Sequence, residues 1–355
     1  MVNNLFSKRA LELESYKAEP KPEGIALDKN EVPWSLDAKV EEALIRRIKA
    51  MEFNRYPDSN CTALKTAVSK YTGVDTASIG IGNGSDELIS VLLQTFIDPG
   101  DTIAVQNPSF SMYKIYGSIC GARIWEYNLD SNFKMNLDEF IAGLQTEKPK
   151  VVFLCNPNNP TGGRLELTEI EQVLKNAGGI VAVDEAYYEF SGLTAAELLK
   201  KYENLVILRT FSKAFGLAGL RIGYMLAAPA VISYIDRVRS PFNVNSFAQI
   251  AAEEVLDNLD AVKERVEIIK NERERLTKLL SELEWLQCFE SWSNFILIRS
   301  VYSGKIYKGL QEAGIHIRSY SGSVLRDCLR ITVGSRSEND KLYETIKEVL
   351  YEGVR

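Results

Sequence analysis

Apolar runs and helix-like stretches alternate through the middle of the chain. The runs are short and end in turn residues, which is typical of strands buried in a parallel sheet. They lie at residues 102–106, 151–155, 180–183, 205–208 and 222–226. Because strands alternate with helices, the pattern predicts an α/β fold with a mostly parallel central sheet flanked by helices on both faces.

The pattern changes after this region. Residues 246–283 are predicted to form a long helix that leads into a second unit. Shorter strands and helices follow it, with strands at 295–298, 315–318 and 329–333 and helices at 304–313 and 337–351. We therefore expect a large domain over residues 46–260 and a smaller α+β domain that contains residues 261–355.

Polar residues follow two of the predicted strands directly. A turn rich in Asn and Pro runs from Asn156 to Gly162, and Asp184-Glu185-Ala186-Tyr187 follows the strand at 180–183. The carboxyl ends of parallel strands share one edge of a sheet, and ligands of open α/β sheets bind there. At that edge Asp184 is either the partner of a protonated ring nitrogen or the N-cap of the next helix.

A third strand end carries hydroxyls and cations. Residues 210–221 read Thr-Phe-Ser-Lys-Ala-Phe-Gly-Leu-Ala-Gly-Leu-Arg and include Lys213 and Arg221. Hydroxyls, an amine and a guanidinium among glycines suit a cofactor with a phosphate and an aldehyde, which the lysine binds as a Schiff base. Pyridoxal phosphate carries both groups. A Ser-Lys pair alone is more often part of a surface loop, so the neighbouring strand ends are what favour the cofactor.

A glycine cluster over residues 80–84 precedes a predicted helix at 85–96. Free backbone amides at the start of that helix would point at an anion. The cluster does not match the dinucleotide pattern Gly-x-Gly-x-x-Gly, because position 85 is serine. We therefore expect a phosphate site, although the carboxylates of Asp86 and Glu87 in the first turn would repel a phosphate.

Composition and charge argue against several other classes of protein. The net charge is −6 and there is no long basic run, so nucleic acid and anionic membranes are not expected as partners. The five cysteines are scattered, without disulfide or zinc spacing. The single histidine, His316, rules out a two-histidine metal site within one chain. With no signal-peptide core and no membrane-length apolar run, we expect a cytoplasmic protein.

Taken together, these motifs resemble the fold-type I pyridoxal-phosphate aminotransferases, and within them the histidinol-phosphate aminotransferase branch. The matching segments span nearly the whole chain, in the family's order. They are Leu27-Asp28-Lys29-Asn30-Glu31, Asn54-Arg55-Tyr56-Pro57-Asp58, Gly82-Asn83-Gly84-Ser85-Asp86-Glu87, Asn159-Pro160-Thr161-Gly162, Asp184 to Tyr187, Ser212-Lys213, Arg221 and Cys328-Leu329-Arg330-Ile331-Thr332-Val333-Gly334. The resemblance implies the family's fold, in which residues 1–45 join residues 261–355 in the small domain.

The resemblance also implies how pyridoxal 5'-phosphate is held. Lys213 would bind its aldehyde and act as general base and acid, and Asp184 would partner the ring nitrogen. Asn159 and Tyr187 would contact the phenolic oxygen, and Phe110 would stack on the ring where the branch more often has tyrosine. The residues expected at the phosphate are Ser85 and Asp86 through their backbone amides, with the acidic side chains turned aside, and Thr210, Ser212, Arg221 and Tyr56.

The substrate residues are likewise implied by the resemblance. Arg330 matches the clamp for a substrate α-carboxylate, which a guanidinium binds through two parallel hydrogen bonds. Arg318 matches a branch position that contacts the substrate's phosphate, and Tyr16 and Asn30 match further substrate contacts. Residues 30–34 read Asn-Glu-Val-Pro-Trp and depart from the branch pattern Asn-Glu-Asn-Pro.

The implied reaction transfers the amino group of histidinol phosphate to 2-oxoglutarate, with glutamate as the second product, in histidine biosynthesis. Histidinol phosphate lacks an α-carboxylate, so Arg330 would meet the phosphate of one substrate and the carboxylate of the other. Tyr56 would reach the neighbouring subunit of a homodimer with shared active sites.

Other functions are compatible with the same cofactor residues. An aromatic or broad-specificity amino-acid aminotransferase, or a threonine-phosphate decarboxylase, would keep nearly all of them. The fold also serves as the effector-sensing module of a transcription regulator, which needs a DNA-binding domain for which we expect no room before Leu27.

Overall fold

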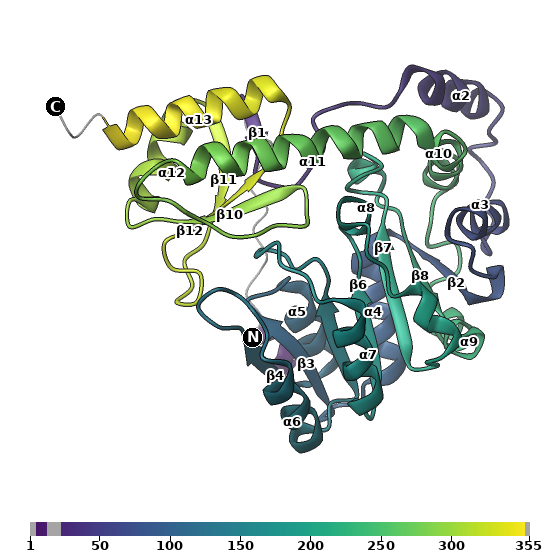
Figure 1. Ribbon diagram of the computed structural model, residues 1–355. Coiled ribbons are helices and arrows are strands. Elements are labelled where there is room, and N and C mark those ends of the chain that lie inside the picture. The colour runs from purple at the N-terminus through teal and green to yellow at the C-terminus, as the bar shows by residue number, and fades with distance from the viewer. Residues whose placement is uncertain (1–4, 13–22, 352–355) are drawn as a thin grey trace.

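Two sheets with helices packed around them make up the computed structural model, which describes residues 5–12 and 23–351 (Figure 1). The larger sheet has the strand order β2-β8-β7-β6-β5-β3-β4. Its strands are β2 (Ile79–Gly82), β3 (Thr102–Asn107), β4 (Arg123–Asn128), β5 (Val151–Cys155), β6 (Ile180–Asp184), β7 (Leu205–Thr210) and β8 (Gly223–Ala227). Strands β3 to β7 are parallel, whereas β8 runs antiparallel to β7 and β2. The predicted mostly parallel sheet is confirmed.

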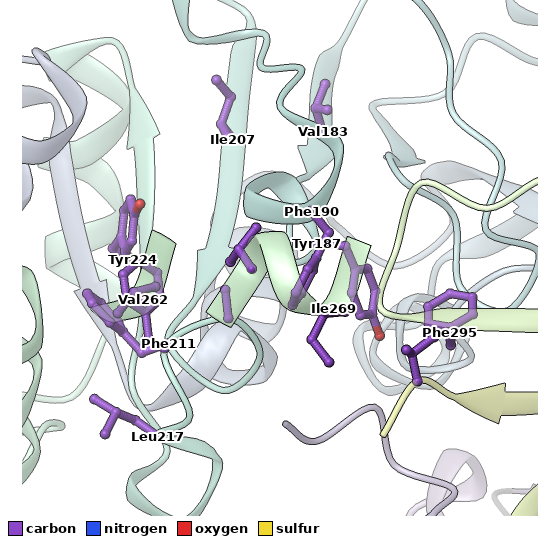
Figure 2. Close-up of a cluster of buried hydrophobic side chains, with 14 of the residues drawn as sticks. Val183, Tyr187, Phe190, Ile207, Phe211, Leu217, Tyr224, Val262, Ile269 and Phe295 are labelled. Carbon is purple, nitrogen blue, oxygen red and sulfur yellow. The ribbon is translucent and has the colours of Figure 1, made fainter. Parts of the chain in front are cut away.

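The large sheet is buried on both faces. Val183 of β6 and Ile207 of β7 belong to one hydrophobic core, while Ala182 and Val206, their neighbours along the strands, belong to a second core on the opposite face. Two-sided burial is why these strands read as continuous apolar runs in the sequence. Figure 2 shows part of the first core, where side chains of the sheet gather with those of surrounding helices.

The two cores are closed by different helices. The second core contains side chains of α4 (Gly84–Phe96), α5 (Met112–Cys120) and α9 (Pro229–Val238). The first core contains side chains of α2 (Ala38–Lys49), α3 (Thr62–Thr72), α6 (Leu137–Glu147), α7 (Leu167–Asn176), α8 (Tyr188–Ser191), α10 (Ser246–Asp257) and α11 (Leu259–Ser281). Shorter helices are α1 (Lys8–Glu12) and the 3-10 turns at Thr76–Ser78, Ala196–Lys200 and Ala218–Leu220.

The smaller sheet has the order β1-β11-β12-β10-β9. Its strands are β1 (Ile25–Leu27), β9 (Gln287–Cys288), β10 (Phe295–Arg299), β11 (Ile315–Ser319) and β12 (Cys328–Thr332). The helices α12 (Ser303–Glu312) and α13 (Arg336–Tyr351) pack on each other beside it. Strand β1 pairs in parallel with β11. A segment near the amino terminus therefore adds an edge strand to the small sheet, which is otherwise built from the carboxyl-terminal part of the chain.

One predicted element is wrong in its extent. Residues 246–283 form two helices, α10 and α11, rather than one. Asn258 between them has φ −123° and ψ 47°, outside the helical region. Its side-chain amide donates a hydrogen bond to the carbonyl of Glu254 at 2.9 Å and so satisfies an acceptor at the end of α10. Helix α11 then runs from the large sheet to the small one (Figure 1).

Candidate active site

The strand ends of the large sheet bring several predicted residues to one edge. Asp184 is the last residue of β6, Thr210 is the last residue of β7, and Asn156 directly follows β5. Because β5, β6 and β7 are adjacent and parallel, their carboxyl ends lie side by side. Lys213 follows β7 at the same edge, so the sheet itself gathers an amine, a carboxylate and a hydroxyl.

Lys213 provides an amine with a lowered pKa. Its Nζ donates a hydrogen bond to the backbone carbonyl of Lys29 at 2.8 Å and lies 6.0 Å from the centre of the Tyr187 ring. Burial lowers the pKa of Lys213 to about 8, and the positive charge of Arg330 acts in the same direction. A larger share of this amine is therefore neutral and nucleophilic near neutral pH than in an ordinary lysine, as attack on an aldehyde requires.

Asp184 is a buried carboxylate with a donor on each oxygen. Its Oδ1 accepts a hydrogen bond from the backbone amide of Ala186 at 3.0 Å, and its Oδ2 accepts one from the hydroxyl of Tyr113 at 2.6 Å. Burial raises the pKa of Asp184 to about 6, and these two hydrogen bonds act against that rise. The N-cap of the following helix is Tyr187, so the N-cap alternative for Asp184 is wrong.

Sequence reasoning missed Tyr113. This residue lies in α5, and its ring is stacked on Phe153 with ring centres 4.5 Å apart. It also meets the ring of Phe110 edge to face at 5.5 Å. In the sequence Tyr113 looks like one more apolar position of a helix. The signal that could have identified it is its phenol group, one helical turn after Phe110, the residue predicted to stack on the cofactor. The helix places that phenol beneath the candidate site.

Asn158 holds two of the loops at this edge together. Its Nδ2 donates to the carbonyl of Pro108 at 3.0 Å and to Oγ1 of Thr161 at 2.9 Å. Its Oδ1 accepts a hydrogen bond from the hydroxyl of Ser109 at 2.7 Å. The loop after β3 and the turn after β5 are thereby fixed to each other, which sets the positions of the residues next to them in the chain.

The predicted residues Asn30 and Tyr187 are hydrogen bonded to each other. The side-chain amide of Asn30 donates to the Tyr187 hydroxyl at 2.8 Å, and the Asn30 backbone amide donates to Oγ1 of Thr332 at 3.0 Å. Burial raises the pKa of Tyr187 above its usual value, so the phenol keeps its proton. The segment that follows β1 is thus anchored to both sheets, and Tyr187 also packs against Phe295 of the small sheet, as Figure 2 shows.

Arg330 reaches the site from the small sheet. Its Nη1 donates to Oδ1 of Asn159 at 2.6 Å, and its Nη2 donates to the backbone carbonyl of Asp28 at 2.5 Å. The buried Nε has no hydrogen-bond partner among the described residues. In the β11–β12 register Arg318 is directly opposite Arg330, and such pairs point to the same face of a sheet. Two guanidinium groups on one face suit an anionic substrate group.

Four of the residues predicted to hold a phosphate, Asp86, Thr210, Ser212 and Arg221, are linked by direct contacts. Arg221 forms an ion pair with Asp86, with Nη2 and Oδ2 2.8 Å apart, and its Nη1 donates to the hydroxyl of Ser212 at 3.3 Å. The hydroxyl of Thr210 donates to that of Ser212 at 3.0 Å. A Cβ on Gly84, whose φ is 81°, would lie 2.7 Å from Nη2 of Arg221. The glycine therefore leaves the space that the guanidinium needs at the start of α4.

Both carboxylates in the first turn of α4 have partners, although only Asp86 is paired with a positive charge. Oε2 of Glu87 accepts hydrogen bonds from the backbone amide of Asn83 and from the side-chain amide of Asn243, both at 2.6 Å. The carboxylate of Asp86 is held by Arg221. These contacts reduce the repulsion expected between the two carboxylates and a phosphate. The sequence alone did not indicate that Arg221 pairs with Asp86 or that Asn243 contacts Glu87. Arg221 contributes most, because it carries a full positive charge.

Several predicted residues lie elsewhere or outside the described chain. Tyr56 is 83% exposed and stacks on Phe242, with ring centres 4.6 Å apart. Tyr16 falls outside the described residues. Nε2 of His316 lies 3.1 Å from the carbonyl of Glu23 and the residue belongs to β11, as expected for a strand position.

Residues 5–12 and 23–351 contain no group of His, Cys, Asp and Glu that could hold a metal ion. All five cysteines are free thiols. No helix in this part of the chain has the length and apolar character needed to cross a membrane. A pocket of about 370 Å³ lies beside Ser212, between the segment from Ala26 to Val32 and the loop that ends at Gly219.

These groups fit a phosphate-bearing aromatic aldehyde. Lys213 offers an amine to the aldehyde, Asp184 a carboxylate to a ring nitrogen, and Tyr187 a protonated phenol to a ring oxygen. Arg221 with its hydroxyl neighbours offers donors to a phosphate. A fold of this kind with these groups at one sheet edge defines the class of enzymes that handle amino groups with a pyridoxal-type cofactor.

The chain belongs to the class I and class II aminotransferases, whose family model, described as "Aminotransferase class I and II", matches residues 22–346. It is 41% identical to the histidinol-phosphate aminotransferase of Thermoanaerobacter pseudethanolicus, over 99% of this chain and 100% of that protein. It is 39% identical to the protein of the same name from Clostridium novyi, over 98% of both chains. The crystal structure of histidinol-phosphate aminotransferase from Sinorhizobium meliloti, in complex with pyridoxal-5'-phosphate, superposes with a TM-score of 0.90 at 25% identity over 98% of both chains. The predicted fold class is confirmed.

Proposed function

We propose that this protein is a pyridoxal-phosphate-dependent aminotransferase that moves the amino group of histidinol phosphate to 2-oxoglutarate, in histidine biosynthesis. The observation that carries the proposal is the meeting of Lys213, Asp184 and Arg330 at the carboxyl edge of the large sheet. The full-length similarity to two proteins named histidinol-phosphate aminotransferase supports the choice of amino donor.

Lys213 performs the proton transfer. When bound, the cofactor supplies an aldehyde that joins amines and a ring that accepts the electrons released at the substrate Cα. Lys213 would hold the cofactor through its aldehyde, and its Nζ, once released, would take the proton from the substrate Cα as a base and deliver it as an acid to the carbon that carries the amino group after transfer. A pKa of about 8 suits both directions, because more of the amine is neutral near pH 7 than in an ordinary lysine, while its protonated form is still available to return the proton.

Asp184, Tyr187 and Asn159 orient the ring. The carboxylate of Asp184 favours a protonated ring nitrogen, which makes the ring a better acceptor of electrons. Tyr187 keeps its phenol proton and donates it toward the ring oxygen. Asn159 accepts a hydrogen bond from Arg330. In the proposed site this one residue would therefore contact both the cofactor and the arginine that binds the substrate.

The two arginines of the small sheet bind the anionic end of each substrate. Arg330 has a buried Nε without a partner among the described residues and is fixed by Asn159 and the Asp28 carbonyl. Arg318 lies opposite it in the sheet. Glutamate presents carboxylates and histidinol phosphate presents a phosphate dianion, so the second guanidinium contributes more to the phosphate.

Steady-state transamination with 2-oxoglutarate tests the choice of substrate. Histidinol phosphate, phenylalanine, tyrosine and threonine phosphate are compared as donors, with the product of each identified. We expect histidinol phosphate to have the highest kcat/KM. A higher kcat/KM for phenylalanine or tyrosine would indicate an aromatic aminotransferase, and release of CO2 from threonine phosphate would indicate a decarboxylase.

Arg318→Ala serves as the matched variant in the same assay. A hydrogen bond to a charged group contributes about 1.5–3 kcal/mol, so the variant should lose about 10–100-fold in kcat/KM for histidinol phosphate. The loss in the half-reaction with glutamate should be several-fold smaller. Equal losses for both substrates would contradict a role of Arg318 in recognising the phosphate.

We further propose that the enzyme is a homodimer with active sites at the interface. Tyr56 and Phe53 are 83% and 77% exposed in the single chain, and Tyr56 stacks on the partly exposed Phe242. Exposed aromatic side chains grouped on one surface are typical of a protein interface. A second copy of this chain is the partner that the two-fold assembly of such enzymes requires, and it would place Tyr56 at the neighbouring phosphate.

Mixing Tyr56→Phe chains with Lys213→Ala chains should restore activity. If Tyr56 acts across the interface, one site of each heterodimer contains both changes and the other contains neither. Loss of the phosphate contact should weaken cofactor affinity about tenfold, so the assay uses a cofactor concentration that leaves Tyr56→Phe homodimers mostly empty. After subunit exchange, activity should exceed the sum of the separate variants. A fully active monomer would contradict the shared site.

The domain division and the location of the protein are also part of the proposal. We assign residues 46–260 to the large domain and residues 1–45 with 261–355 to the small domain, supported by the pairing of β1 with β11. We place the enzyme in the cytoplasm, since five free thiols fit a reducing compartment.

A further inference from the structure

The hydrogen bond between Tyr113 and Asp184 is short and fully enclosed. The Tyr113 hydroxyl lies 2.6 Å from Oδ2 of Asp184, within the range of hydrogen bonds from a hydroxyl to a charged carboxylate. The two residues are 1% and 3% exposed, so water does not compete for either partner. A hydrogen bond of this kind is stronger in a buried site than in water, and losing it leaves the carboxylate poorly solvated.

The ring of Tyr113 can make this hydrogen bond in one orientation. Phe153 of β5 is stacked on one side with an interplanar angle of 10°, and Phe110 lies against the ring at 83°. Phe110 is the residue expected to stack on the cofactor. The same aromatic cluster therefore supports both the face of the cofactor ring and the carboxylate expected at its nitrogen.

Two neighbouring carboxylates and the burial of Asp184 oppose its charged form. Asp86 and Glu185 carry like charges, and burial of the carboxyl group acts in the same direction. The nearby thiol of Cys155 has a pKa raised to about 12 by burial and by the charge of Asp184, so it stays neutral. The donors that favour the ionised carboxylate are the Ala186 amide and the Tyr113 hydroxyl.

We propose that Tyr113 is a positioning residue that keeps Asp184 ionised and aimed at the cofactor's ring nitrogen, and so determines on which atom the shared proton resides. This inference rests on the proposed function. One proton would be shared between the Asp184 carboxylate and the ring nitrogen, and no other reactant is needed. The Tyr113 hydroxyl on Oδ2 lowers the basicity of the carboxylate, so the proton would stay on nitrogen. Without that donor the carboxylate becomes more basic, and the proton moves toward oxygen.

Tyr113→Phe tests this inference because it removes the hydroxyl and keeps the stacked ring. The variant and the wild-type enzyme are reconstituted with pyridoxal phosphate labelled with 15N in the ring, and the nitrogen chemical shift is recorded. In the variant the shift should move toward that of a neutral pyridine. The half-reaction with glutamate should slow about tenfold or more, as expected for loss of a hydrogen bond to a charged group.

Tyr224→Phe is the matched control. Tyr224 of β8 is also fully buried, and its hydroxyl accepts a hydrogen bond from Arg209 at 3.3 Å, whereas the Tyr113 hydroxyl donates to Asp184. Deleting this hydroxyl should leave the 15N shift unchanged. In an Asp184→Asn background, Tyr113→Phe should change the half-reaction by less than about twofold, because a residue that acts through Asp184 has nothing left to act on.

The outcomes separate this inference from the proposed function. A wild-type enzyme that binds no pyridoxal phosphate at Lys213 would overturn the proposed function and this inference with it. A wild-type enzyme that binds the cofactor, together with a Tyr113→Phe variant whose nitrogen shift and half-reaction rate are unchanged, would overturn the role of Tyr113 alone. A slower variant with an unchanged nitrogen shift would likewise reject it, since that result indicates a general packing effect.

Discussion

Lys213→Ala is expected to lower turnover by at least about 10²–10⁴-fold, the loss typical of a missing general acid and base. The amine is held by the Lys29 carbonyl at 2.8 Å, and its pKa is lowered to about 8. Alanine removes the group that binds the aldehyde as well as the group that moves the proton. Cofactor should still bind through the phosphate residues, with lower affinity and without a covalent link.

Borohydride reduction followed by peptide mapping identifies the attached lysine. In the wild-type enzyme the pyridoxyl group should be found on Lys213, and in Lys213→Ala it should be absent. Lys29→Ala is the matched control, because Lys213 donates to the backbone carbonyl of Lys29, which alanine retains. This control should keep the label on Lys213. A label on Lys29 or on any other lysine would reject the assignment.

The sequence predicted the sheet edge well because its signals are local. A buried parallel strand reads as a continuous apolar run, and the polar residue after it is adjacent in the chain, as with Asp184 after β6. Two strands of the large sheet escaped this reasoning. The short strand β2 reads Ile-Gly-Ile-Gly, and β4 at the sheet edge mixes exposed and partly buried residues, so neither forms an apolar run.

The interactions that could not be predicted join residues far apart in the chain. Tyr113 reaches Asp184 across 71 positions, and Arg330 reaches Asn159 across 171. Helix periodicity marks Tyr113 as a buried position but does not say which polar group its hydroxyl meets. The break at Asn258 was missed for a related reason, since its effect depends on a side-chain hydrogen bond rather than on the apolar pattern.

These distant contacts organise the site. The hydrogen bond from Arg330 to Asn159 links the substrate arginine of the small sheet to a turn of the large sheet. The hydrogen bond from Asn30 to Tyr187 makes a similar link from the segment after β1. The resemblance placed these residues near one cofactor, and the structure shows that they also bind one another. A change in one should therefore affect neighbours with which it shares a hydrogen bond.

Asp184→Asn is expected to slow the half-reaction while leaving cofactor binding largely intact. A nearby opposite charge shifts a pKa by about 1–3 units, so the ratio of protonated to neutral ring nitrogen should fall about 10–10³-fold when the carboxylate becomes an amide. The amide oxygen can still accept from the Ala186 amide, and the amide nitrogen can donate to the Tyr113 hydroxyl, while the phosphate residues around Arg221 are unchanged. The fold and the site should therefore persist without the negative charge.

Stopped-flow absorbance of the bound cofactor, mixed with glutamate or histidinol phosphate, measures this half-reaction directly. Both donors should be slowed by a similar factor, because the ring nitrogen serves both. Asp86→Asn is the matched control: it removes a carboxylate that pairs with Arg221 at the phosphate end, so it should alter cofactor affinity more than the rate of the half-reaction. If Asp184→Asn reacts at the wild-type rate, the carboxylate does not control the ring nitrogen. In that case the raised pKa of Asp184 reflects its burial and the like charges of Asp86 and Glu185, with no role in the reaction.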